Sequence, residues 1–379
     1  MGGPLHLYFL GLTAIGFDSL WGQMVRNGTA QAIGQAKATG VLASGAVLRS
    51  VYTGLPAVDR LLHAPVIFYD SLTHGRDPAY RALLVALFSS MQTISFSQLV
   101  LGLRSSRHPV WPFLENLFWA MFNQSHGAAF VYPLYFFTHL AQVTTAETPQ
   151  GKHDQLDQLD EVDAEALVYT SVLAAVLPAW LIVTAYMPCS AETRQVLIAS
   201  YRLTPAILSA AAPLLSRFLR AVRGWRRGAA SCSTSCAART RRLVKLSLVL
   251  SGAAAAIGHL YGVATGLLSS RATLAAVFWP GATTNLQAGA AHVLTRGCHL
   301  FLQNDWWVIA AATAPYASAV IASSGARRTD PGDSRCMGSW YEWAEKVVAS
   351  LGGKWVPLTF LTLLLSPGAV LAWSTAVTV

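Results

Sequence analysis

The feature that most constrains this chain is a series of apolar runs on the scale of a bilayer-spanning helix. Crossing the hydrocarbon core takes about 20 apolar residues at a rise of about 1.5 Å per residue. Eight runs approach or exceed this length, at residues 5–21, 80–103, 113–142, 165–187, 196–216, 244–268, 303–323 and 355–376. Because lipid offers no partners for exposed backbone groups, we predict an all-α, polytopic membrane helix bundle of about eight transmembrane helices.

The composition supports one membrane domain that covers residues 1–379. Of the 379 residues, 53% are hydrophobic and 12% are charged, whereas a soluble domain carries roughly 25% charged residues. The mean hydropathy of +0.42 excludes disorder, which needs low hydrophobicity and high charge. No stretch between the apolar runs is long enough to bury a second core.

The stretch from 51 to 72 is apolar but is not predicted to be a ninth span. It contains Asp59, Arg60, His63, Pro65 and Asp70, and such groups are costly when they face lipid. We therefore expect a re-entrant or interfacial element here.

The basic residues predict the orientation of the bundle. The loop from Arg217 to Lys245 carries nine basic residues and no acid, and short loops rich in Lys and Arg stay in the cytosol. With eight spans, the segment 23–80 and the basic loop around Arg327 lie on the same side, and both termini are lumenal. The formal net charge of +9 therefore indicates orientation in the membrane, with endoplasmic reticulum as the expected location, rather than a nucleic-acid partner.

The most informative stretch lies at Trp111 to His139, where polar groups sit in an apolar span. Glu115, Trp119, Phe122 and His126 repeat at helical spacing and share one face, which we expect to point into the bundle. An acid in an apolar site is a plausible proton donor, and intramembrane ionisable groups are functional by default. The alternative is that Glu115 and the neighbouring amides only hold the bundle together through interhelical hydrogen bonds.

A second group of polar residues opens the seventh run, with Asp305 beside Trp306 and Trp307. Trp has the best aromatic face for a cation, so Asp305 and Trp306 could pair a proton donor or counter-ion with a surface that stabilises a carbocation. The alternative is an interfacial belt, since Trp is enriched where membrane meets water.

A third candidate is the acidic run DQLDQLDEVDAE at 154–165, most of which lies in the acidic loop at about 144–164; it contains Asp154, Asp157, Asp160, Glu161, Asp163 and Glu165. Acidic clusters can hold Mg²⁺ on a diphosphate, but a second such motif is missing, so we interpret the run as a solvated loop or helix start. The five cysteines contain no CxxC pair, and we find no phosphate loop, catalytic triad or haem signature. We therefore expect no metal and no cofactor.

The stretch ENLFWAMFNQSHGAAFVYPLYFFTHL at 115–140 and the pentapeptide QNDWW at 303–307 give the chain its family resemblance. It resembles the fungal integral-membrane terpene cyclases of meroterpenoid biosynthesis, especially those of the ascofuranone and ascochlorin type. The resemblance implies an isomerase that protonates an epoxide or olefin on a farnesyl chain carried by an aromatic or polyketide acceptor. The chain would then cyclise through carbocations without metal.

The same resemblance implies the site residues and partners. Smaller relatives use two intramembrane acids, and the residues here that look equivalent are Glu115 and Asp305. The expected substrate-binding residues are Asn116, Trp119, Asn123, Gln124, His126, Tyr132, Asn304 and Trp306. The expected partners are a hydrophobic prenylated small molecule and the lipid bilayer, with no obligate protein partner.

Two other functions remain open from the sequence. One is a sterol-isomerase-like membrane enzyme, which also uses acid catalysis in an apolar cavity. The other is a non-enzymatic transporter of a hydrophobic small molecule, for which inverted repeats with broken helices would be expected.

Overall fold

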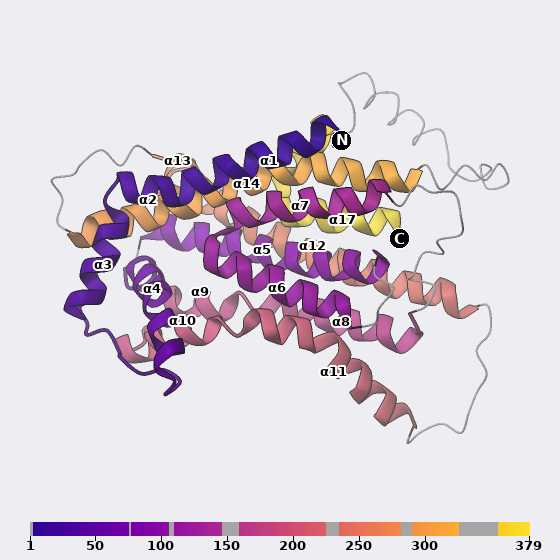
Figure 1. Cartoon of the computed structure of the whole chain (residues 1–379), viewed down its shortest axis with the longest axis horizontal. Coiled ribbons are helices and arrows are strands. Elements are labelled where there is room, and N and C mark those ends of the chain that lie inside the picture. The colour runs from indigo at the N-terminus through magenta and orange to yellow at the C-terminus, as the bar shows by residue number, and fades with distance from the viewer. Residues whose placement is uncertain are drawn as a thin grey trace.

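A computed structural model describes residues 3–75, 77–105, 110–145, 159–224, 235–281, 290–325 and 355–379. These residues form an all-α bundle whose longer helices run roughly side by side (Figure 1), as predicted. Within them, an isolated β-bridge joins Val41 and Val47. Four helical stretches are long and apolar enough to cross a membrane: Pro78–Arg104, Glu161–Tyr186, Thr204–Arg223 and Ala238–Leu268. The number of crossings remains a prediction.

The centre of the bundle is α5 (Pro78–Ser105), against which α12 (Ser235–Leu268) packs along much of its length. The outer face of α12 contacts α8 (Glu161–Val176), while α14 (Ala290–Gly325) packs against α7 (Ala128–Thr145) and α17 (Pro367–Thr378). The remaining elements are α1 (Pro4–Phe17), a π-helical turn η1 (Asp18–Gly22), α2 (Gln23–Arg26), α3 (Thr29–Thr39), α4 (Pro56–Thr73), α6 (Trp111–His126), α9 (Ala179–Tyr186), α10 (Ala191–Tyr201), α11 (Thr204–Gly224), α13 (Leu274–Phe278) and α16 (Trp355–Leu365).

The predicted span at 113–142 is wrong, because this run forms a helical hairpin. Gly127 ends α6 with φ 90° and ψ 149°, a backbone conformation that glycine adopts at little steric cost. The ring centroids of Trp119 and Tyr135 are 5.5 Å apart, whereas one continuous helix would separate these residues by about 24 Å. The α6–α7 hairpin therefore enters and leaves the bundle at the same end.

This hairpin changes which loops share an end of the bundle. Helices α5 and α12 are antiparallel, since Thr93 donates to the Ser251 carbonyl at 2.9 Å and Ser89 occupies the space that a Cβ on Gly258 would need. The facing ends of α11 and α12, which flank the basic loop, therefore lie at the opposite end from α3 and α4 (Figure 1). The prediction that the segment 23–80 and this loop share a side is thus wrong, and both termini lie towards the end with the basic loop.

Three other predicted runs are interrupted as well. Arg202 and Leu203 separate α10 from α11, Leu177 and Pro178 separate α8 from α9, and Ser366, with φ 142°, separates α16 from α17. Hydropathy averages over a window and does not register such short breaks.

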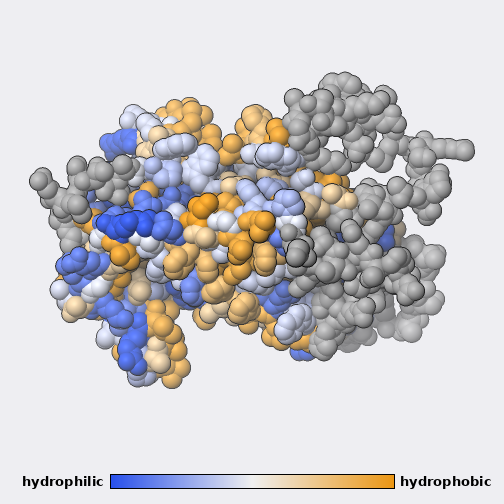
Figure 2. Space-filling model, turned by 45° about the horizontal axis from the view of Figure 1, so that its top comes forward, coloured by the Kyte–Doolittle hydropathy of each residue, from blue (hydrophilic) through white to orange (hydrophobic). Residues whose placement is uncertain are grey.

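The surface and the stretch 51–72 agree with a protein placed in a bilayer. Hydrophobic side chains gather over the middle of the molecule in Figure 2, and hydrophilic ones gather towards the end that carries α3. Helix α4 covers most of 51–72 and buries one face, including Leu62, Val66 and Asp70. The interfacial placement of α4 remains a prediction.

Candidate active site

A cavity of about 830 Å³ lies between α4, α5, α10, α14 and the α6–α7 hairpin. This volume is in the range of small-molecule sites, which are mostly apolar with a few placed polar groups. Aromatic side chains supply much of the wall: Trp21, Tyr52, Phe68, Tyr69, Phe88, Tyr132, Tyr201 and Phe301. The charged residues on the wall are Asp305 and Arg202.

Asp305 brings a buried carboxyl group from α14 to the tip of the hairpin. Asp305 is 2% exposed, and its Oδ1 accepts a hydrogen bond from the backbone N–H of Ala129 at 2.6 Å. The first N–H groups of a helix have no acceptor within that helix, so Asp305 caps α7 from another element. The positive end of the α7 dipole also favours an anion at this position.

Arg202 occupies the equivalent place on the other arm of the hairpin. It lies in the break between α10 and α11, and its guanidinium donates to the carbonyl of Gln124 in the last turn of α6. A cation is favourable at the carbonyl end of a helix. Tyr69 lines the same cavity as Arg202 and Asp305.

Two amides of α6 complete the polar part of the wall. The Asn123 amide donates to the Tyr132 hydroxyl at 3.1 Å, and that hydroxyl donates to the Met91 carbonyl at 2.9 Å. The Gln124 amide donates to Thr204 at 3.0 Å. The Oδ1 of Asn123 and the Oε1 of Gln124 are buried without a hydrogen-bond partner among the described residues.

Four of the sequence-predicted site residues line this cavity: Asn123, Gln124, Tyr132 and Asp305. Glu115 does not. Helix α6 buries Pro112, Asn116, Ala120 and Asn123, so the inward face is the stripe next to the predicted one. Glu115 is half-buried and lies 12 residues before Gly127, about 18 Å along the helix axis, so the structure does not bring the two predicted acids together.

The neighbours of Asp305 point elsewhere, because consecutive helical residues are about 100° apart around the axis. Asn304 donates to the Ser19 carbonyl at 3.0 Å and to Gln23 at 2.8 Å. The Trp306 ring stacks on His259, with centroids 5.6 Å apart and planes at 6°. Trp306 is therefore not among the residues that line the cavity with Asp305, and its part in the site stays a prediction.

The other predicted residues serve the packing of the hairpin. Asn116 donates to Ser209 at 3.0 Å and so ties α6 to α11. Trp119 packs edge-on against Tyr135. The ring centroids of His126 and Phe122 are 4.4 Å apart. The backbone carbonyl of His126 accepts the indole N–H of Trp21 at 2.8 Å.

The sequence alone did not mark most of the aromatic wall, or Arg202, as part of the site. These residues come from several elements far apart in the chain, so no local periodicity marks them. One signal was present: Tyr201 and Arg202 interrupt an otherwise apolar run.

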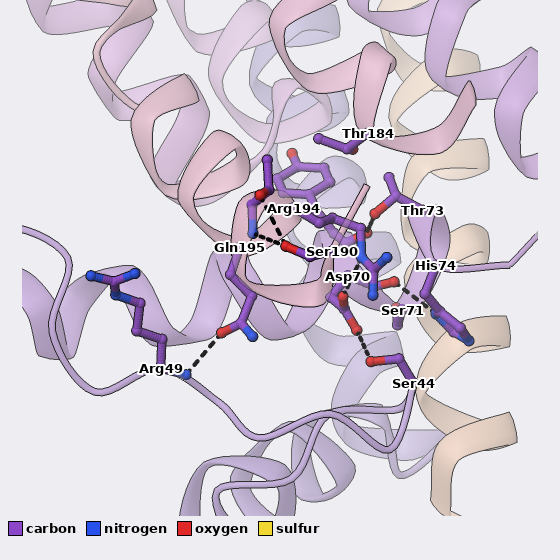
Figure 3. A network of polar contacts seen from close by, with 12 residues as sticks. Ser44, Arg49, Asp70, Ser71, Thr73, His74, Thr184, Ser190, Arg194 and Gln195 are labelled. Carbon is purple, nitrogen blue, oxygen red and sulfur yellow. Dashed lines mark hydrogen bonds and ion pairs between the residues drawn. The ribbon is translucent and has the colours of Figure 1, made fainter. Parts of the chain in front are cut away.

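A strap formed by residues 40–55 covers one side of the cavity, to which Tyr52 and Thr53 contribute. Gln195 of α10 pins it, since its side-chain carbonyl accepts the Arg49 N–H at 2.8 Å and the Tyr52 hydroxyl at 3.1 Å. The Gln195 amide donates to Val47 at 2.9 Å. Figure 3 shows Gln195 reaching towards Arg49 on the strap.

The same network satisfies Asp70, one of the acids that interrupt the stretch 51–72 (Figure 3). Its carboxylate pairs with Arg194 at 2.7 Å and accepts the Ser44 hydroxyl at 2.9 Å. Asp70 is thus a partner for the strap and for α10 rather than an acid free to react.

The acidic run at its described positions is a helix start, as interpreted. Asp160 caps α8 by accepting the Asp163 N–H at 2.8 Å and pairs with Arg220 at 2.9 Å, while Glu165 pairs with Arg223. Asp154 and Asp157 lie outside the described residues. No group of three potential metal ligands occurs within the described ranges.

Comparisons with known proteins point in one direction. The sequence model of the CtvD domain matches residues 5–371. A protein of Emericella nidulans named terpene cyclase alnG is 33% identical over 381 residues, which cover 97% of this chain and 92% of that protein. Proteins named terpene cyclase DEP1 are 28% identical in Fusarium langsethiae, over 82% of this chain and 84% of the relative, and 27% identical in Alternaria brassicicola, over 97% and 96%. No solved structure matches.

Proposed function

The chain belongs to the CtvD-domain family and is an enzyme of the terpene cyclase type, and from this premise we propose that it is a membrane-bound cyclase whose acid is Asp305. The observation that supports this mechanism is a buried carboxyl group on the wall of an apolar cavity of about 830 Å³. The sterol-isomerase-like and transporter alternatives receive no support from the names of the relatives.

The proposed substrate is a farnesyl chain attached to an aromatic or polyketide acceptor, with an epoxide or an alkene at its reacting end. An apolar aromatic wall suits a prenyl chain because burial of its methylene and methyl groups is favourable, at about 25 cal/mol per Å². The cavity volume also exceeds the lower bound of about 300 Å³ for small-molecule sites. Access from the bilayer would follow from the apolar outer surface.

The proposed first step transfers the proton of the Asp305 carboxyl group to the epoxide oxygen or to an alkene carbon. In the epoxide case, the C–O bond to the more substituted carbon breaks as that carbon develops positive charge. The neighbouring double bond supplies its electron pair to form a ring C–C bond and passes the charge along the chain. Loss of a proton from the last cation, or attack by an acceptor oxygen that then loses its proton, returns a proton to Asp305. The product is an isomer of the substrate.

The hairpin supports this cycle at the stage when Asp305 is a carboxylate. The Ala129 N–H and the positive end of α7 are fixed by the fold, so they stabilise the anion without reorganising. The aromatic faces of Phe68 and Phe301 on the cavity wall are suited to stabilise the cation and to keep water from trapping it.

Conversion of a farnesylated phenol that carries a terminal epoxide tests the proposal. Microsomes that contain the wild-type chain should form a cyclised product of unchanged mass, and those with Asp305→Asn should not. A chelator should leave turnover unchanged, whereas a Mg²⁺ requirement would favour a prenyltransferase. A diol, heavier by one water molecule, would show that the enzyme opens epoxides without forming a carbon ring, and would overturn the proposal.

A further inference from the structure

We propose that Arg202 is the head-group residue of this site: it binds an acidic or strongly hydrogen-bond-accepting oxygen of the substrate's acceptor and selects prenyl compounds that carry one. The inference deepens the proposed function and rests on it for the identity of the prenyl chain. Its physical basis is a cation on an apolar cavity wall that has spare donors and no carboxylate partner in the part of the chain that the structure describes.

The guanidinium of Arg202 has more donors than the protein uses. Arginine carries five N–H donors in a fixed planar fork. Among the described residues, the hydrogen bond found from this side chain goes to the carbonyl of Gln124, and no carboxylate lies within ion-pair distance of it. The other donors lie on a residue that lines the cavity.

Arg194 of α10, eight residues before Arg202, makes the difference clear. Arg194 is 11% exposed at its side chain and pairs with the fully buried Asp70 at 2.7 Å. Buried charges are normally paired in this way, because an unpaired one is costly. Arg202 is partly buried, and no carboxylate of the described residues pairs with it, so an anionic oxygen of a bound molecule would supply that partner.

The surroundings of Arg202 fit a protic, oxygen-bearing head. The Oε1 of Gln124 and the Oδ1 of Asn123 are buried acceptors without partners among the described residues, and both residues line the same cavity. A head that presents an anionic or carbonyl oxygen to Arg202 and a hydroxyl to one of these amides would satisfy both kinds of group. A buried polar group without a hydrogen-bond partner costs free energy. Substrate heads that lack the matching oxygen and hydroxyl should therefore bind poorly.

This placement separates recognition from chemistry within one cavity. Arg202 and Asp305 cap different arms of the α6–α7 hairpin, and both line the cavity. A head held at Arg202 leaves its prenyl tail among the aromatic walls that Asp305 shares. Arg202 would therefore act as a positioning and specificity residue and not as the acid.

A binding measurement tests Arg202 independently of turnover. Detergent-purified protein is equilibrated with radiolabelled farnesoic acid or methyl farnesoate, which share the chain and differ in the charge of the head. A charge-assisted hydrogen bond should favour the acid by about tenfold or more in the wild type. Arg202→Gln should reduce this preference to about twofold or less, because it weakens the binding of the acid much more than that of the ester, whose carbonyl accepts only a weaker, neutral hydrogen bond.

Three variants separate this role from a structural one. Arg202→Lys keeps the charge but loses the planar fork, and it should retain part of the preference even if Arg202→Gln proves unstable. Trp21→Phe removes the hydrogen bond from the indole N–H to the His126 carbonyl, which also lies at the end of α6, but it changes no charge. It should therefore change the binding of acid and ester equally. Asp305→Asn should abolish turnover but keep the preference, so failure of the proposed acid would not look like failure of the head-group site. Equal binding of acid and ester by the wild type, or an unchanged preference in both Arg202 variants, would overturn the inference.

Discussion

Arg202 and Asp305 hold the two facing ends of one helical hairpin: the guanidinium donates to the carbonyl of Gln124 at the end of α6, and the carboxylate accepts the N–H of Ala129 at the start of α7. Each charge has the sign that the adjacent helix dipole favours. Both residues also line the cavity. The contacts that fix the hairpin tip therefore also fix the two charged groups of the site, and a change at the tip should reach the chemistry.

Asp305→Asn should abolish cyclisation while the protein still folds. Asparagine keeps a side-chain oxygen that can accept the Ala129 N–H, but it has no carboxyl proton to transfer. Positioned acid catalysis contributes typically 10²- to 10⁴-fold, and we expect a loss of at least this size. Product formed per unit of monodisperse, purified protein is the relevant measurement.

Asp305→Ala and Trp306→Phe provide the matched controls for this variant. The alanine also removes the cap on α7, which should lower the free energy of unfolding by about 1 kcal/mol. Its melting temperature should therefore fall along with its activity. Trp306 stacks on His259 away from the cavity, so its replacement should reduce stability and spare specific activity. Turnover in Asp305→Asn near that of the wild type would remove Asp305 from the mechanism.

Glu115→Gln should keep most of the cyclase activity, within about threefold of the wild type, well short of the 10²-fold or larger loss expected for a catalytic acid. The sequence favours Glu115 as the proton donor, but the residue does not line the cavity. Phe118, three residues further along α6 on the same side as Glu115, is 58% exposed. This side of the helix is therefore not buried in the bundle. Activity of Glu115→Gln and Asp305→Asn compared in the same assay decides which acid initiates the reaction.

The sequence predicts the fold class well and the arrangement of the site only in part. An apolar run indicates a helix that is buried in lipid or protein. The run at 80–103 follows this rule, since it forms the single long helix α5. Apolar runs do not report a turn made by one residue, so Gly127 converts a predicted span into a hairpin. Because the hairpin does not cross the bundle, the helix ends that flank the basic loop lie at the opposite end from α3 and α4 (Figure 1), and not at the same end as the hydropathy predicts.

The site residues show the same limit. Asp305 could be predicted because an acid in an apolar run is rare. The direction of its neighbour Trp306 could not, since it depends on the packing of α12 and α13 around the ring. Arg202 was missed because its significance comes from the α6 carbonyl that it caps, a contact between residues 78 positions apart.

Gly127→Ala should destabilise the hairpin. The position has φ 90°, and an added Cβ would lie 2.5 Å from Leu20 and 3.0 Å from Phe301. Backbone strain and overpacking together should cost about 2–4 kcal/mol, with loss of activity because Asp305 caps the next turn. Thermal unfolding in detergent measures the effect. Gly11→Ala is the matched control: nothing lies within 4 Å of its added Cβ, so it should be neutral or slightly stabilising.

Tags inserted at Gly45 and after Gly224 should show opposite protease protection in sealed microsomes. The first lies on the strap between α3 and α4 and the second ends α11. Helices α3 and α4 lie at the opposite end of the bundle from the last turns of α11 (Figure 1). If 113–142 crossed the membrane once, as the hydropathy predicts, both tags would be on one side. Equal protection of the two tags would therefore contradict the hairpin topology.

Gln195→Ala should release the strap and weaken substrate binding. The substitution removes three hydrogen bonds to residues 47–52, each worth about 0.5–1.5 kcal/mol net, and Tyr52 on the strap forms part of the cavity wall. Trypsin should then cut after Arg49 several times faster than in the wild type, and the substrate concentration needed for half-maximal turnover should rise more than the maximal rate falls. Ser190→Ala is the control, because it removes the cap of the same helix α10, the bond from the Thr193 N–H at 3.1 Å, without touching the strap. If Ser190→Ala accelerates cleavage after Arg49 as much as Gln195→Ala does, the strap responds to the stability of α10 in general and is not pinned by Gln195.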